Sequence, residues 1–271
     1  MNPSSQGAFD ALLEYVEDEL GFATSHYNDS YLGRRITARM RRVDSPTFEA
    51  YLDLLSTDDE EPGALLDAFS INVTGFFRNP PMWEALRPVL RELSESRRRV
   101  RLWSAACSDG REAYSLAMQA LADPEVEESR VSITATDINQ AALRRAEAGQ
   151  YRSTRTTDIA DQLSPLDDVD AYVDREGDRF AIRPAVKRLV EFRRHDLIRD
   201  DPLGPFDLVL CRNLFIYIDA GRKEPILETI EASLAPRGYL VIGMAETLPA
   251  PYRRSFETVA DRSRIHRRID A

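Results

Sequence analysis

The stretch VRLWSAACSDGREAYSLAM, residues 100–118, joins an apolar strand pattern to an amphipathic helix pattern through a turn of small residues. A short apolar run bounded by turn residues predicts a buried strand, and an apolar repeat every three to four residues predicts a helix. The same alternation continues along the chain and is typical of a mostly parallel sheet with helices on its faces. We therefore expect an α/β fold with strands at 99–104, 131–136, 188–193, 206–211 and 239–243 and helices at 111–122, 139–148 and 220–235.

Regions outside this alternation complete the expected organisation. Residues 171–182, AYVDREGDRFAI, predict a β-hairpin, and the segments 253–259 and 263–268 predict a second hairpin at the edge of the sheet. Toward the N-terminus, apolar residues repeat with helical spacing in four successive segments. Our expected division is an all-helical domain with a basic helix at 1–71, a linker segment and helix at 72–93, and the α/β domain at 94–271 with a β-subdomain at about 155–187.

Composition excludes some classes of function. The chain has 271 residues, 43% of them hydrophobic, which is enough for a packed core and excludes global disorder. Its formal net charge of -10 argues against a nucleic-acid binder, because phosphate binding favours a positive average charge. Lysine occurs only at positions 187 and 223, so 34 of the 36 basic residues are arginines. Adaptation to high salt and a GC-rich genome are both compatible with that bias.

The cysteines and the apolar segments set further expectations. Cys107 and Cys211 lie far apart and in no metal or redox spacing, so we expect buried, reduced thiols and no metal site. The N-terminal segment has no basic stretch followed by an apolar run, and no later segment is long enough to cross a bilayer. We expect a cytoplasmic protein without direct membrane insertion.

The turn after the first strand is where a doubly wound sheet binds a nucleotide-like ligand. It contains one glycine, Gly110, whereas backbone binding of a pyrophosphate requires the spacing G-x-G-x-x-G. S-adenosylmethionine carries an adenosine, no phosphate and a cationic sulfonium, which suits a turn followed by the carboxylate of Glu112. The alternative is that the small residues serve tight packing and that Glu112 stabilises the N-terminus of its helix. The pattern leaves both open.

Polar residues also follow other strands of the predicted sheet. Asp137 ends the second strand, where a carboxylate can accept hydrogen bonds from both ribose hydroxyls, although an aspartate there is also a common helix cap. Asn213 and Tyr217 follow the fourth strand and leave the sheet on the same side. Asn213 could instead only satisfy backbone groups in a loop. The convergence of three strand ends predicts one binding crevice.

The segment NVTGFFRNP, residues 72–80, joins the helical region to the α/β region. Its two phenylalanines favour core positions, whereas Asn72, Thr74 and Arg78 are polar groups that predict the wall of a site. A guanidinium can orient a substrate carboxylate through two parallel hydrogen bonds. The alternative role for Arg78 is a salt bridge between domains.

Five strings occur in order along the chain and carry a resemblance to a known family: NVTGFFR, LWSAACSDGREAYSLAM, TATDIN, AGQY and FDLVLCRNLFIYID. Together they resemble the chemotaxis-receptor glutamate methyltransferases, the CheR family, over nearly the whole chain. The resemblance implies a Rossmann-like sheet that binds S-adenosylmethionine, with a small β-hairpin subdomain, behind an all-helical domain. It further implies a glutamate γ-methyl ester on the cytoplasmic coiled coil of a chemoreceptor, with S-adenosylhomocysteine as the second product.

The resemblance also implies which residues form the site. Cofactor contacts fall on Asn72, Thr74, Arg78, Glu112, Asp137, Asp196, Leu197, Asn213 and Leu214. We take Arg78 and Tyr217 as the residues that hold the substrate carboxylate in line with the methyl group. The family has asparagine where this chain has Asp196, and a carboxylate can only accept hydrogen bonds. An acceptor still suits an adenine amino group, so we expect altered affinity and retained binding.

Other departures from the family concern the loops. Arg111 and Ala113 stand where the family commonly has Glu and Pro, and Met244-Ala245 precede Glu246 where His-Ser is frequent. The hairpin turns within DREGDR, which is similar to the shorter type that does not dock on a receptor's C-terminal pentapeptide.

The N-terminal helices supply a candidate substrate surface. Arg35, Arg39 and Arg42 are spaced i, i+4 and i+7 on one helix, and this arginine stripe can steer and register rows of receptor glutamates. A solvated helix face is the alternative. Two other functions also stay open: a methyltransferase that acts on a different protein or a small acid, and a non-catalytic signalling module that binds cofactor or receptor.

Overall fold

The structure is a computed structural model that describes residues 3–69 and 74–269. It divides the chain into two units. One unit consists of residues 1–71 together with Phe215–Glu224, and the other consists of residues 72–214 and 225–271. A short segment that follows the fourth strand of the predicted sheet thus belongs to the helical unit.

The helical unit is built from four amphipathic helices, as the apolar spacing predicted. They are α1 (Pro3–Asp18), α2 (Asp29–Arg42), α3 (Phe48–Thr57) and α4 (Glu61–Phe69). The side chain of Asn28 caps α2 by accepting a hydrogen bond from the backbone of Tyr31, and Thr47 caps α3 in the same way. The apolar faces meet in a core that includes Phe9, Leu32 and Ile36, each fully buried.

The larger unit contains a seven-stranded sheet in the order β6-β2-β1-β7-β8-β10-β9. The first five strands in that order are parallel, and β10 runs antiparallel to both of its neighbours. The predicted hairpin at the sheet edge is therefore confirmed. The strands span Val190–Arg194 (β6), Val131–Asp137 (β2), Val100–Ala105 (β1), Phe206–Cys211 (β7), Leu234–Ile242 (β8), Ile265–Arg268 (β10) and Phe256–Ala260 (β9).

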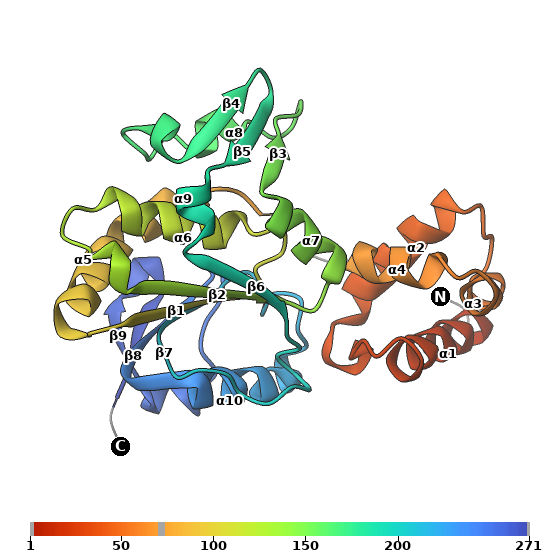
Figure 1. Ribbon diagram of the computed structural model, residues 1–271. Helices are drawn as coiled ribbons and strands as arrows, with labels where there is room; N and C mark the ends of the chain where they lie inside the picture. Colours follow the sequence, from red (N-terminus) through yellow and green to blue (C-terminus); the bar gives the residue numbers. More distant parts are fainter. Residues whose placement is uncertain (1–2, 70–73, 270–271) are drawn as a thin grey trace. The chain divides into compact units, whose positions relative to one another are not determined.

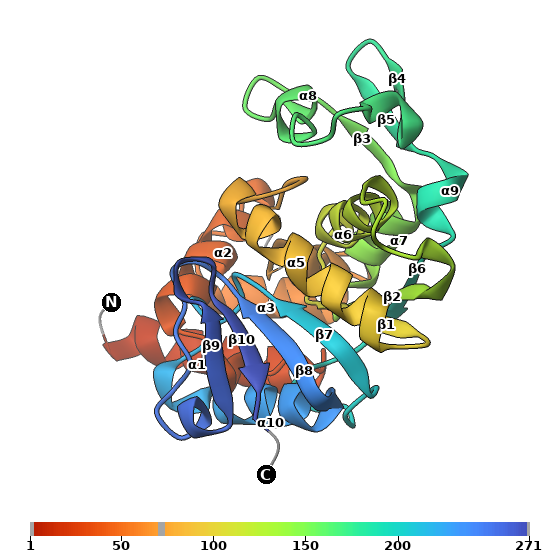
Figure 2. The ribbon, with the colours of Figure 1, turned by 90° about the vertical axis from the view of Figure 1, so that its left-hand side faces the viewer.

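Helices cover both faces of this sheet and confirm the predicted α/β fold (Figures 1 and 2). One face carries α5 (Pro80–Ser96), α6 (Arg111–Ala122) and α7 (Gln140–Ala148), and the other carries α10 (Glu224–Ser233). All six residues of β7 are buried, as expected for a central parallel strand with layers on both sides. The strand order reverses between β1 and β7, so the carboxyl ends of these two strands flank the crevice where such sheets bind ligands.

A second, three-stranded antiparallel sheet has the order β3-β5-β4. Its strands are Gln150–Arg152 (β3), Val173–Glu176 (β4) and Arg179–Ile182 (β5), with the short helices α8 (Ile159–Gln162) and α9 (Pro184–Lys187) beside them. The hairpin predicted at 171–182 is confirmed, and only Gly177 and Asp178 connect its strands. This small sheet lies beyond α9, apart from the large sheet, in both views of the ribbon (Figures 1 and 2).

Candidate functional site

The turn between β1 and α6 has left-handed backbone at alternate positions. Ala106, Ser108 and Gly110 have φ values of 55°, 53° and 86°. This region favours glycine, and side chains held there store strain that is concentrated at functional sites. At Gly110 there is also no room for a side chain, because a Cβ on it would lie 2.7 Å from the Cβ of Ala146. The turn thus combines tight packing of α6 with an unusual loop backbone, and its contact with a cofactor stays a prediction.

The two carboxylates predicted beside this turn are held by short hydrogen bonds. Asp137 accepts a hydrogen bond from the backbone N–H of Ser108 at 2.8 Å and another from that of Asn139 at 2.9 Å. Burial raises the pKa of the Asp137 carboxyl, and these amide hydrogens partly offset the effect. Glu112 accepts from the Ser104 hydroxyl at 2.9 Å. Both carboxylates are therefore fixed near the carboxyl edge of the sheet by donors of the protein itself, and their contact with a cofactor stays a prediction.

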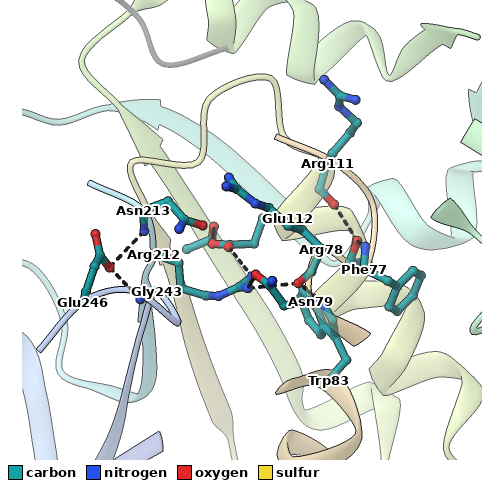
Figure 3. Close-up of polar contacts among 12 residues, drawn as sticks. Phe77, Arg78, Asn79, Trp83, Arg111, Glu112, Arg212, Asn213, Gly243 and Glu246 are labelled. Carbon is teal, nitrogen blue, oxygen red and sulfur yellow. Dashed lines mark hydrogen bonds and ion pairs between the residues drawn. The ribbon is translucent and has the colours of Figure 1, made fainter. Parts of the chain in front are cut away.

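A buried arginine that the sequence interpretation passed over lies at the centre of the site. Arg212 follows β7 directly and donates to Glu112 Oε2 at 3.0 Å, to the Arg78 carbonyl at 2.9 Å and to Asn79 Oδ1 at 2.9 Å (Figure 3). Its guanidinium also lies over the ring of Trp83, 5.8 Å from the centroid. A charged residue placed immediately after a fully buried strand was the signal that could have identified it.

The segment 74–79 is fixed to the larger unit by several contacts. The backbone N–H of Phe77 donates to the Ser115 hydroxyl at 2.9 Å, and the Trp83 indole donates to the Arg78 carbonyl at 3.0 Å. Phe77 and its neighbour Phe76 are buried, which confirms their predicted core positions. Arg78 and Thr74 are half-buried, whereas Asn72 lies outside the described residues. The described part of the predicted site wall, residues 74–79, is thus a loop held in front of α5.

The loop after β7 depends on a second residue that the sequence interpretation did not assign. Glu246 is buried, and its Oε2 accepts from the backbone of Asn213 at 3.0 Å and from that of Gly243 at 2.6 Å (Figure 3). Asn213 has a φ of 63°, and a Cβ on Gly243 would lie 2.6 Å from Glu246 Oε2. The carboxylate therefore sets the strained backbone of Asn213, while Leu214 beside it is buried.

Asp196, which follows β6, has an unusual hydrogen-bond state. Its Oδ1 accepts from the backbone N–H of Ile198 at 2.9 Å. Its Oδ2 is buried, and in the described part of the chain this oxygen has no hydrogen-bond partner. A buried acceptor without a donor is costly unless a ligand supplies one. Leu197 beside it is buried and apolar. This pair fits an adenine, whose amino group donates.

Tyr217, predicted to hold the substrate carboxylate, belongs to the helical unit and not to the unit that contains the predicted cofactor residues. Its carbonyl accepts from the backbone of Asn28, and its ring lies 4.7 Å from that of Tyr31. Arg35 in turn lies over the Tyr31 ring, with its Cζ 5.3 Å from the centroid. Burial raises the pKa of Tyr31 to about 12, against the lowering effect of Arg35, so this phenol is neutral.

The three arginines of the predicted stripe have different surroundings. Arg39 donates from Nε and Nη2 to the two oxygens of Glu61, at 2.7 and 2.6 Å, and Tyr51 donates to the same carboxylate. Arg35 is half-buried on Tyr31, and Arg42 is exposed. Arg34 and Arg41 on the same helix are exposed as well.

Comparison with known proteins identifies the family. Residues 7–70 match the family described as "CheR methyltransferase, all-alpha domain", and residues 72–265 match "CheR methyltransferase, SAM binding domain". This chain belongs to the CheR methyltransferase family. A chemotaxis protein methyltransferase of Listeria monocytogenes is 37% identical over 88% of this chain and 89% of its own length. Chemotaxis protein methyltransferase 1 of Pseudomonas aeruginosa is 40% identical over 68% of this chain and 69% of its own length.

Membership in the CheR family makes S-adenosylmethionine the cofactor of this methyltransferase. The residues present fit that group: Glu112 and Asp137 supply acceptors at the ends of β1 and β2, and Asp196 supplies an unpaired acceptor after β6. Within residues 3–69 and 74–269, no cluster of three or more potential ligands could hold a metal ion, and no helix is long and apolar enough to span a membrane. Cys107 and Cys211 are buried free thiols, as predicted.

Proposed function

We propose that this CheR-family protein transfers a methyl group from S-adenosylmethionine to glutamate side chains on the cytoplasmic helices of a chemoreceptor. The observation that carries the proposal is that one chain holds partly or fully buried carboxylates at the carboxyl edge of a parallel sheet and, in its other unit, a helix rich in exposed arginines. The names of the relatives, which are chemotaxis protein methyltransferases, support it. Because the substrate would be the cytoplasmic part of a receptor, we place the reaction in the cytoplasm.

The chemistry requires little proton transfer. The bound cofactor supplies a methyl group on a sulfonium and leaves as the neutral thioether S-adenosylhomocysteine. A glutamate carboxylate is already ionised at neutral pH, so one of its oxygens can form the new bond to the methyl carbon without a general base. The contribution of the protein is therefore alignment and proximity, which can lower the barrier by several kcal/mol.

Arg78 and Tyr217 are our candidates for that alignment. A guanidinium can hold a carboxylate through two parallel hydrogen bonds, and a neutral phenol can donate a third. We expect Arg78→Ala to lower kcat at saturating cofactor by about a hundredfold, a larger effect than its loss of S-adenosylhomocysteine affinity, because Arg78 is also a predicted cofactor contact. Tyr217→Phe should lower kcat without loss of that binding. Near-normal turnover of Arg78→Ala with intact cofactor binding would refute this assignment.

The outer face of α2 is the proposed docking surface for the receptor helix. Arg42 is exposed there, together with Arg34 and Arg41, which are seven residues apart and therefore lie on nearly the same side of the helix. A row of cations at this spacing suits an acidic helix packed alongside. Arg35 begins the row near Tyr31, and Arg39 is engaged by Glu61.

We further propose that docking does not use a tether to the receptor's C-terminal pentapeptide. The support is the tight β4–β5 hairpin, whose strands are connected by two residues only. Addition of a free pentapeptide should then leave the rate of receptor methylation unchanged. Competition by that peptide would contradict this part of the proposal.

The decisive experiment is a labelled-methyl assay with purified cytoplasmic receptor fragments from the same cell, run across salt concentrations. The expected result is label that becomes attached to the fragment and is released by mild alkali, as a glutamate ester should be. Fragments with the methylatable glutamates replaced by alanine are the control. Label on another protein or a small acid, with none on receptors, would indicate a different substrate, and cofactor binding without any product would indicate a non-catalytic module.

A further inference from the structure

Arg212 combines burial, charge and an unusual distribution of its hydrogen bonds. Its side chain is 1% exposed, and all of its acceptors lie in the larger unit. We propose that Arg212 is a positioning residue. It links Glu112, a predicted cofactor contact, to the loop that carries Arg78, the candidate substrate contact, so that one guanidinium orients both.

The first support is the distribution of donors over separate segments. Nη1 donates to Glu112, in the first turn of α6, while Nη2 donates to both the Arg78 carbonyl and Asn79 Oδ1 in front of α5. The Nε–H is buried and has no partner in the part of the chain that the structure describes. The guanidinium therefore reaches two segments at the expense of one of its own hydrogen bonds.

The second support is the partner of the Asn79 side chain. Asn79 occupies the N-cap position of α5, where an asparagine side chain normally accepts a hydrogen bond from the first turn of the helix. Here the first two helical residues are Pro80 and Pro81, which have no backbone N–H to donate, and the Oδ1 of Asn79 accepts from Arg212. Phe77 and Asn79 are also held at φ values of 44° and 63°. The Asn79 side chain thus binds Arg212 from a loop with strained backbone, and such strain is concentrated at functional sites.

The third support is chemical. The flat guanidinium lies over the Trp83 ring, whose indole donates to the same Arg78 carbonyl. Lysine has a single ammonium at the end of a flexible chain, so it cannot meet three acceptors in a plane and stack on an aromatic ring. An arginine is therefore required for this arrangement, and Arg212→Lys becomes the informative substitution.

The consequence is coupling between two subsites. Substitution of Glu112 should shift the position of Arg78, and substitution of Asn79 should change the affinity for the cofactor. The reason is that Arg212 bridges the side chains of Glu112 and Asn79. The half of this inference that concerns Arg78 rests on the proposed function. The half that concerns cofactor binding does not.

The experiment compares Arg212→Lys with two variants that each remove one acceptor. Glu112→Gln removes the charge of the first, and Asn79→Gly removes the side chain of the second while suiting its left-handed backbone. The readouts are S-adenosylhomocysteine affinity by calorimetry, hydrogen exchange of residues 77–82 without ligand, and kcat and KM in the methylation assay. Arg91→Lys is the control for the loss of a paired guanidinium, because Arg91 is paired with Asp123 and Glu125 and with no predicted site residue.

We expect Arg212→Lys to weaken S-adenosylhomocysteine binding about tenfold, to speed exchange at 77–82 and to lower kcat at saturating cofactor about a hundredfold. Asn79→Gly should speed the same exchange and weaken cofactor binding, and its effect should be smaller in the Arg212→Lys background, because the two share one interaction. Arg91→Lys should change none of these readouts.

Two outcomes would overturn the proposal. One is that Arg212→Lys lowers thermal stability while affinity and exchange stay at wild-type values, which would make Arg212 only structural. The other is full additivity of the effects of Asn79→Gly and Arg212→Lys on affinity. If Arg212→Lys does not fold, unchanged affinity in Asn79→Gly refutes the coupling by itself. Calorimetry and exchange need no receptor, so a wrong substrate assignment would leave these tests intact.

Discussion

Each unit of the molecule contains a partly or fully buried arginine–carboxylate pair, and the two pairs use the guanidinium differently. In the helical unit, Arg39 directs two donors at one carboxylate, Glu61, which is 4% exposed and also accepts from Tyr51. In the larger unit, Arg212 donates from Nη1 to Glu112 and from Nη2 to the Arg78 carbonyl and Asn79 Oδ1.

The difference separates a stabilising pair from a positioning one. A bidentate contact between neighbouring helices satisfies both partners and leaves little for a ligand. A guanidinium shared among segments at the carboxyl edge of a sheet satisfies each acceptor once and transmits displacement between them. We therefore expect apolar replacement of the Arg39–Glu61 pair to leave methylation intact. Apolar replacement of the Arg212–Glu112 pair should abolish cofactor binding even where stability recovers.

The largest effect should come from removal of the shared guanidinium. Arg212→Met leaves Glu112, whose side chain is 13% exposed, without its cation, and should lower the free energy of unfolding by about 3–5 kcal/mol. Arg212→Met with Glu112→Met should recover much of that stability but no cofactor binding. Urea unfolding and calorimetry give the two quantities. Recovery of cofactor binding in the double variant would make the pair purely structural.

The pair in the helical unit should behave in the opposite way. Arg39→Met should cost about 2 kcal/mol, because Arg39 is 20% exposed and Tyr51 still donates to Glu61. The double variant Arg39→Met, Glu61→Met should regain stability and retain receptor methylation. Urea unfolding and the methylation assay test this together. Lasting loss of methylation in the stable double variant would show that Arg39 itself contacts the receptor, as the arginine stripe suggested.

An exposed arginine of the same helix provides the contrast. Arg42→Glu should change the free energy of unfolding by less than about 0.5 kcal/mol, since Arg42 is exposed. It should nevertheless lower the rate of receptor methylation about tenfold at low salt, and less at high salt, because screening weakens charge attraction. Cofactor affinity is the control readout. A matching loss of cofactor affinity would point to misfolding.

The smallest effect concerns Tyr31, which lies between Arg35 and Tyr217. Its pKa in the folded protein is about 12, above the ordinary value of 10.0, so the folded state binds more protons than the unfolded state between these values. Stability is therefore complete below pH 10 and is lost as pH rises toward 12. Between pH 10 and 11 the wild type should lose about 1 kcal/mol more than Tyr31→Phe. If denaturant titrations show that the wild type and Tyr31→Phe lose equal free energies of unfolding over this range, the pH dependence comes from groups other than Tyr31.

The sequence could place several candidate site residues near one edge of the sheet because they follow buried strands. Asp137 ends β2, Asn213 follows β7 and Glu112 lies in the helix after β1, and a parallel sheet brings these carboxyl ends to one edge. Arg212 and Glu246 were missed, because their hydrogen-bond partners lie far away in the sequence and cannot be identified from the residues around them. Arg39 was assigned by its spacing along α2, which cannot show that Glu61, 22 residues away, occupies its donors.

The amino-acid sequence alone was sufficient for the alternation of strands and helices, the helical N-terminal region, both hairpins and the family's cofactor motifs. These features depend on periodicity and turn chemistry within a few neighbouring residues. The tertiary structure alone decided which arginines donate their hydrogen bonds to partners inside the protein. Arg212 meets Glu112 across 100 positions and Asn79 across 133, and only the order of the strands and the packing of helices on them can bring such groups together.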